Sequence, residues 1–145
     1  MAKVTTIKTT SPTEKYEIFA ITSNCDEFQF CSLLNQLLTI DLQAQKPYKR
    51  VLNKKNVSLI YFSSWDELRK LKVTVIDNQG YGAPLVDFMK NINFFVKMVF
   101  PNDGMLVECQ KILSENGNMT FVQRIDRDKL TRQQLTTFNA LFDKI

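Results

Sequence analysis

The chain has 145 residues and a formal net charge of +4; 44% of its residues are apolar and 23% are charged. These globular values, with only 4 glycines and 4 prolines, exclude a low-complexity chain and extended disorder. No apolar run approaches the ~20 residues of a membrane span, and the length fits one domain with its own core. We therefore expect a single domain over residues 14–145. Residues 1–13 before it are either a flexible segment or, through Val4 and Ile7, an added edge strand.

The first predicted elements are a strand and a helix. Tyr16–Ser23 predicts a strand with apolar residues on both faces, as in a central strand. Asn24 and Glu27 then have the spacing of a capping box. Behind them, apolar residues at steps of one, three and four predict a helix over about residues 25–40. These residues are Phe30, Cys31, Leu34, Leu37 and Leu38.

The middle of the chain predicts strands joined by turns, because it is rich in β-branched and aromatic residues. Residues 64–70 fit either a helical turn or a hairpin loop, and Asn78–Pro84 has the strongest turn composition in the chain. The predicted strands are 50–52, 57–63, 71–77 and 92–100.

The last third predicts helix, strand and helix. Met105–Leu113 has a helical apolar stripe closed by Asn116-Gly117, and Met119–Ile125 alternates as a strand. Thr131 and Gln134 form a second capping box before the final apolar stripe, which we expect to pack on the sheet rather than to face a partner. The order β-α-β-β-β-β-α-β-α predicts an α+β fold. We expect a largely antiparallel sheet of about 5–6 strands with two long helices packed on one face.

Several stretches of the chain follow the pattern of a known family. Phe19-Ala20-Ile21-Thr22-Ser23 precedes the helical pattern that reaches Ile40, and Val75-Ile76-Asp77-Asn78 precedes a glycine-containing turn. The strand Ile92-Asn93-Phe94-Phe95-Val96 follows, and Asn139-Ala140-Leu141-Phe142 comes near the end. Over about residues 16–142 this succession resembles the IPExxxVDY family, a bacterial family named after a motif in its middle.

The motif itself falls on residues 86–94. With the family's spacing, Val86-Asp87-Phe88 takes the Ile-Pro-Glu positions and Ile92-Asn93-Phe94 takes the Val-Asp-Tyr positions. The apolar pattern is retained while Pro, Glu, Asp and Tyr are replaced, and one inserted residue would bring Asp87 to the Glu position. The resemblance implies the fold and a bacterial cytoplasm and gives functional weight to this region. It implies no substrate.

The residue types needed for common catalytic and metal sites are missing. The sequence has no histidine, the usual general base near neutral pH and the commonest metal ligand. Cys25, Cys31 and Cys109 lack the spacing of a zinc site and predict buried thiols in the reducing cytoplasm. Gly80-Tyr81-Gly82 lacks the Lys-Ser/Thr of a phosphate loop. We expect no catalytic site, no metal and no cofactor.

The positive charge is concentrated in one segment. Residues 46–72 carry eight positive and two negative side chains, whereas the other residues are net negative by two. Such a segment binds phosphates by counterion release, and an aromatic ring within it can stack on an unpaired base. A solubilising loop or a protein-docking surface is the more common role of such a segment. The polyanion-binding candidates are Lys46, Tyr48, Lys49, Arg50, Lys54 and Lys55, extended by Arg69, Lys70 and Lys72 if the next hairpin folds back beside them.

Three functional hypotheses remain open at this point. The first is a non-catalytic interaction module that docks on another protein or on itself. The second is an RNA- or ribosome-associated factor that binds polyanions through residues 46–55. The third is an enzyme with an acid near Asp87. We expect a protein partner or self-association, with nucleic acid as the alternative partner and no membrane.

Overall fold

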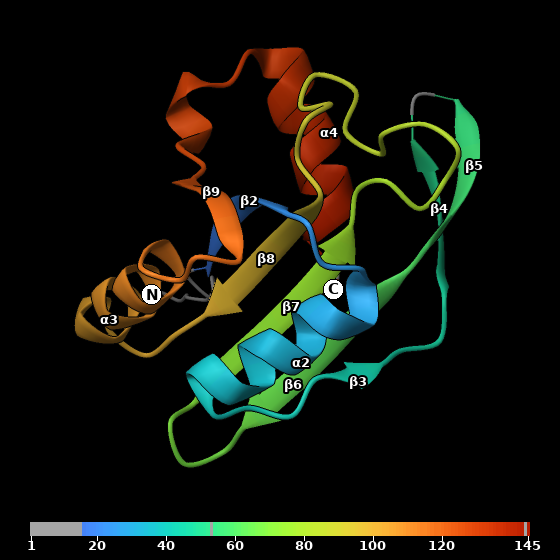
Figure 1. The fold of residues 1–145 in the computed structure, drawn as a ribbon. Helices are drawn as coiled ribbons and strands as arrows, with labels where there is room; N and C mark the ends of the chain where they lie inside the picture. The colour runs from blue at the N-terminus through green and yellow to red at the C-terminus, as the bar shows by residue number, and fades with distance from the viewer. Residues whose placement is uncertain (1–15, 53, 144) are drawn as a thin grey trace, which may run out of the picture.

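The computed structural model describes residues 16–52, 54–143 and 145, and Figure 1 shows its helices and strands. The predicted N-terminal segment 1–13 lies outside the described residues. None of the helices within them has the length and apolar character to cross a bilayer. The elements in chain order are β2 (Tyr16–Ser23), α2 (Glu27–Leu38), β3 (Gln43–Ala44), β4 (Tyr48–Leu52), β5 (Lys55–Leu59), β6 (Tyr61–Asp66), β7 (Leu71–Asp77), β8 (Phe94–Val99), α3 (Asp103–Ser114), β9 (Met119–Arg124), the 3₁₀ turn η1 (Arg127–Lys129) and α4 (Arg132–Phe142).

In the described part of the chain, six strands form one antiparallel sheet in the order β3-β6-β7-β8-β2-β9, and β4 pairs with β5 in a separate hairpin. The predicted α+β fold with a largely antiparallel sheet is confirmed. The strand missing from the predicted order is β3, whose two residues are both exposed and give no alternating pattern. Residues 57–63, expected as one strand, divide at Ile60 between the hairpin and the sheet.

Helices cover both faces of the sheet (Figure 1). α2 and α3 pack on one face, where Phe30 stacks on Phe94 with ring centres 4.1 Å apart; we call this the first core. α4 packs on the opposite face, where Phe138 meets Phe95 edge-on at 5.7 Å; this is the second core. The expectation of helices on one face is therefore wrong. Its physical reason lies in β8, whose neighbouring Phe94 and Phe95 are both buried and point to opposite faces.

The two capping predictions have different outcomes. The final box is confirmed, since Thr131 Oγ1 accepts from Gln134 N at 3.2 Å and Gln134 Oε1 accepts from Thr131 N at 3.0 Å. The first predicted box is wrong, because the N-cap lies two residues later than predicted. The N-cap of α2 is Asp26, whose carboxylate accepts from Gln29 N at 2.8 Å. Glu27 therefore lies in the first turn of α2 and is not part of the cap.

A lysine from the sheet holds the C-terminal end of α4. Lys97 of β8 is only 7% exposed, and its ammonium donates to Phe142 O at 2.6 Å and Ile145 O at 2.9 Å. The last carbonyls of a helix lack intrahelical donors, and a cation there complements the helix dipole. The same nitrogen lies 4.3 Å from the ring centre of Tyr16. The Lys97 side chain thus links the end of α4 to the face of the sheet that carries the second core.

The long loop between β7 and β8 is ordered around one buried asparagine. Asn78 is 0% exposed. Its Nδ2 donates to Met89 O at 3.1 Å and Ile92 O at 2.8 Å, and its Oδ1 accepts from Val86 N at 2.8 Å. Loops of this length are uncommon in small domains and are often functional. Asn78 fixes the stretch that carries Asp87 to a defined place on the molecule.

Candidate functional site

The basic segment folds as the β4–β5 hairpin, which projects beside the main sheet (Figure 1). Leu52 and Leu59 are buried in the second core, so the hairpin covers part of that core. The strand alternation then turns Lys49 and Val51 away from the core, and Val51 is 66% exposed. The hairpin therefore presents an exposed face in which an apolar side chain stands beside a cation.

An open groove of about 740 Å³ runs along the middle of the hairpin. We call it the hairpin groove, and none of the described residues that line it is acidic. Its character is cationic, polar and in part apolar, which suits a negatively charged partner with an apolar side chain. The lining residues are Lys49, Arg50, Val51, Asn56, Val57 and Ser58.

Among the described residues that line this groove, Arg50 has a buried polar atom without a hydrogen-bond partner. Its guanidinium carbon lies 5.2 Å from the ring centre of Tyr48. Its Nε is buried and has no hydrogen-bond partner among the described residues. A buried donor without a partner costs on the order of 1–3 kcal/mol, and a guanidinium is best satisfied by a carboxylate or phosphate oxygen. Arg50 thus has an unsatisfied donor, which an oxyanion can reach once the side chain turns out from over the Tyr48 ring.

Tyr48 does not offer its ring to a ligand in the way the sequence predicted. The ring packs against the second core and is covered by Arg50. Stacking an unpaired base requires an accessible aromatic face. The hairpin therefore has cations for a polyanion and lacks the stacking surface that was expected to accompany them.

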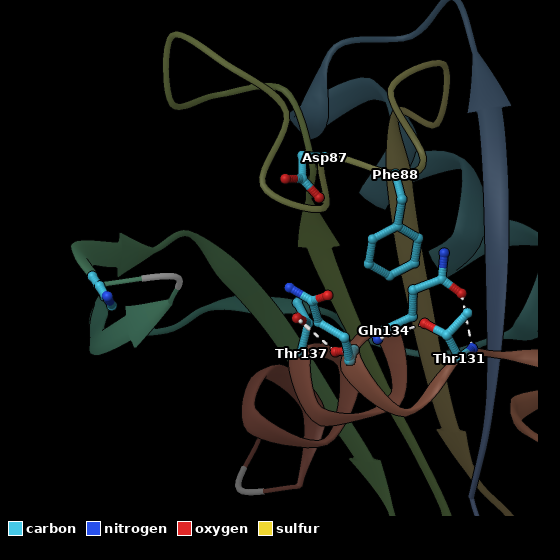
Figure 2. Close-up of a pocket in the computed structure, with 7 residues that line it drawn as sticks. Asp87, Phe88, Thr131, Gln134 and Thr137 are labelled. Atoms are coloured by element: carbon cyan, nitrogen blue, oxygen red, sulfur yellow. Dashed lines mark hydrogen bonds between the residues drawn. The ribbon is translucent and has the colours of Figure 1, made fainter.

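A second hollow, of about 530 Å³, brings the hairpin and the motif region together (Figure 2). We call it the tip cleft. Figure 2 shows Asp87 and Phe88 of the loop opposite Thr131, Gln134 and Thr137 of α4 and its cap. Lys54 from the hairpin completes the lining together with Gln133. Residues far apart in sequence, from the basic segment and from the motif region, thus share one depression.

The tip cleft has little that would support catalysis. Asp87 is exposed at its rim, and Thr131 and Gln134 are engaged in capping α4. Phe88 is held by Phe138, with ring centres 5.7 Å apart. No described side chain that lines it is placed as a nucleophile beside a base. An enzymatic role of Asp87 stays a prediction without support from its surroundings.

The other residues of the motif region have structural contacts. Ile92 and Phe94 are buried in the second and first core, respectively. Asn93 Oδ1 accepts from Ser23 N at 3.0 Å, and Asn93 N donates to Ile21 O at 2.9 Å. The polar side chain of Asn93, which the resemblance would align with the Asp of the motif, therefore joins the loop to β2.

Two of the three cations expected to extend the basic segment are occupied elsewhere. Arg69 and Lys70 lie in the β6–β7 turn, at the far end of β6 from the hairpin (Figure 1). Arg69 pairs with Asp66 at 2.6 Å, and Lys70 pairs with Glu67 at 2.8 Å. The β6–β7 hairpin does not fold back beside the basic segment. The exposed cations of the candidate site are Lys46, Lys49, Lys54 and Lys55.

The structure also pairs two carboxyl groups that the sequence analysis did not connect. Glu27 in the first turn of α2 meets Asp77 at the end of β7, where Asp77 is nearly buried. A hydrogen bond between the two carboxyls raises the pKa of Glu27, with further contributions from burial and from the charges of Asp77 and Asp26. The placement of Glu27 in a capping box concealed this pairing, since a capping role already explained an acid there.

We expect Glu27→Gln to stabilise the protein at pH 7. Because folding raises the pKa of Glu27, its favourable contribution is complete below about pH 4 and is lost as the pH rises through the raised pKa. The substitution removes that loss and raises the free energy of unfolding at pH 7 by about 0.5 kcal/mol. The value is small because solvent screens this partly exposed pair. Urea denaturation at pH 4 and pH 7 measures the effect. Asp103→Asn, at the same position of α3, should give no gain, and an equal response of both variants would contradict the pairing.

No family model matches the chain, and no curated protein matches it. The resemblance to the IPExxxVDY family therefore stays a prediction, carried by the residues quoted for it.

Proposed function

We propose that this chain is a non-catalytic protein-interaction module whose hairpin groove docks an acidic segment of a partner protein. The observation that carries the proposal is the buried Nε of Arg50, which lines the groove and has no hydrogen-bond partner among the described residues. A carboxylate of the partner would satisfy this donor once the Arg50 side chain turns out from the Tyr48 ring, and Lys49 would add a second charge. The exposed Val51 supplies an apolar contact beside Lys49, with which it shares the outward face of the hairpin.

A protein segment fits the groove better than a nucleic acid does. Recognition of single strands relies on aromatic stacking, and the ring of Tyr48 is turned to the second core. Protein interfaces instead combine an apolar anchor with polar neighbours, the combination supplied by Val51 with Asn56 and Ser58. Residence in the cytoplasm is part of the proposal and is supported by the free thiols of Cys25, Cys31 and Cys109.

The polyanion-binding alternative keeps one observation in its favour. Lys46, Lys49, Lys54 and Lys55 are all exposed, and neither strand of the hairpin contains an acid. An RNA backbone could contact these cations without base stacking, by a mechanism that weakens steeply with salt. The test below therefore includes an RNA ligand.

The test is a titration of the isotope-labelled full chain, followed by the amide NMR signals of the hairpin. The ligands are a short polyglutamate peptide with one central leucine, the same peptide with alanine, and a single-stranded oligouridine. We expect the leucine peptide to bind most tightly and to shift Lys49, Val51 and Ser58. Arg50→Lys retains the charge without the Nε–H and should weaken binding about tenfold, whereas Lys111→Ala, on α3, should not.

Two outcomes would reject the proposal. Binding of the RNA with no response to either peptide would favour the polyanion alternative. Shifts that lie outside the hairpin, or an Arg50→Lys variant that binds as the wild type does, would remove the groove as the docking surface.

A further inference from the structure

The sheet ends on one side in β9, whose outer edge is open among the described residues. β9 pairs with β2 on one side only and ends the strand order. Four of its six residues, Thr120, Phe121, Gln123 and Arg124, are exposed. An edge strand presents a row of backbone donors and acceptors to any second strand that can reach it.

The hydrogen-bond pattern shows which backbone groups face outward. Ile125 N donates to Ile18 O at 2.8 Å, which places Ile125 and Ile18 in a hydrogen-bonded pair. Since such pairs alternate along an antiparallel ladder, the amides of Val122 and Arg124 point away from β2. Neither amide has a hydrogen-bond partner in the described part of the chain. The outward groups of these two residues form a short segment ready for pairing.

The six residues of β9 include no lysine and no proline, and the irregularity in its pairing with β2 lies at the Thr22–Ser23 end. Natural edges are protected by lysine, proline or inward charges, and the exposed β4–β5 hairpin has Lys49, Arg50 and the preceding Pro47. β9 carries a single charge, Arg124, which Glu17 of β2 already neutralises at 2.9 Å. Two copies of β9 can therefore approach each other without net repulsion.

We infer that β9 is the interface of a symmetric dimer, in which two copies of the chain pair antiparallel through this strand. A twofold axis at Gln123 sets Val122 of each copy opposite Arg124 of the other, so that the outward amides and carbonyls of both residues bond across the axis. The side-chain amides of Gln123 from the two copies face each other, and each can both donate and accept. Phe121, which is 45% exposed in one chain, is covered by the second strand.

The interface predicts a charge-dependent association. Gln123→Lys or Gln123→Glu places like charges opposite each other at the axis and should weaken the dimer about tenfold or more in either case. An equal mixture of the two variants places opposite charges there and should restore association. Because position 123 is exposed, neither substitution disturbs a core. Arg50→Lys in the hairpin groove should leave the association unchanged, which separates this inference from the proposed docking function.

Sedimentation equilibrium of the full chain provides the test. We expect the average mass to rise from one chain toward two as the concentration increases into the high micromolar range, and amide exchange at Val122 to slow in parallel. A wild-type chain that remains monomeric throughout overturns the inference. Single variants that associate as the wild type does overturn it too. Slow exchange at Val122 at all concentrations also does so, because another part of the chain would then cover the edge.

Discussion

Asn78→Ala is expected to be among the most destabilising single substitutions in this chain, with a loss of about 3 kcal/mol. The change removes both side-chain donors from the carbonyls of Met89 and Ile92 and leaves Val86 N buried without an acceptor. The unsatisfied Val86 N costs on the order of 1–3 kcal/mol, and the lost bonds to the two carbonyls, which keep Ile92 N and Gln79 Nε2 as donors, add about 1 kcal/mol. The midpoint of urea unfolding, at unchanged slope, measures the loss.

The control for this prediction lies in the next residue. Gln79 also bonds the loop, donating to Lys90 O and Ile92 O at 2.7 Å each, but its side chain is exposed. Gln79→Ala should therefore cost only about 1 kcal/mol, because water replaces the lost bonds. In Asn78→Ala, exchange of the Val86 amide should accelerate more than that of β8. A loss no larger than that of Gln79→Ala would show that the loop is held by its apolar contacts instead.

Lys97→Met is expected to destabilise the protein by about 2–3 kcal/mol and to loosen α4 more than the sheet. Methionine has nearly the same length and fills the same space, so the loss comes from the hydrogen bonds to Phe142 O and Ile145 O and from the cation at the helix end. Thermal unfolding measures the total change. Amide exchange in α4 shows where it is concentrated.

A second lysine at a helix end provides the matched comparison. Lys111 lies in the last turn of α3 but is exposed, so Lys111→Met should cost about 0.5 kcal/mol, the usual value for a solvated charge near a helix terminus. Equal effects of the two substitutions would mean that the burial of Lys97 adds nothing. A stabilised Lys97→Met variant would mean that the cost of burying the ammonium exceeds its bonds.

The fold class could be predicted because hydrophobic periodicity is local. β2, β7 and β9 occur close to their predicted ranges, as does the second capping box. The side of the sheet on which each helix packs could not be predicted in this way. That choice depends on long-range partners such as Phe138 with Phe95, which no periodicity encodes. β3 also escaped detection, since two exposed residues pair only because β6 lies beside them.

The sequence predicted where the candidate site lies, but it did not predict which chemical groups the site presents. The charge of residues 46–55 marked the hairpin, but composition cannot tell which side chains turn inward. The pairing of Arg50 with Val57 places its guanidinium over Tyr48, and this removes the stacking ring and leaves a buried donor. The tip cleft likewise required the loop order imposed by Asn78, whose buried hydrogen bonds no sequence pattern indicated.

The placement of two cores on opposite faces of one sheet has a consequence for local opening. The first core is formed by α2, α3 and the sheet, whereas the hairpin and α4 share the second. We therefore expect the hairpin and α4 to open from the sheet together, at a free energy below that of global unfolding, while the first core stays closed. Since the proposed groove belongs to that unit, a bound partner would favour its closed state and suppress this opening in proportion to occupancy. Binding at the hairpin would then also slow amide exchange at the far end of α4, because both elements open in the same equilibrium.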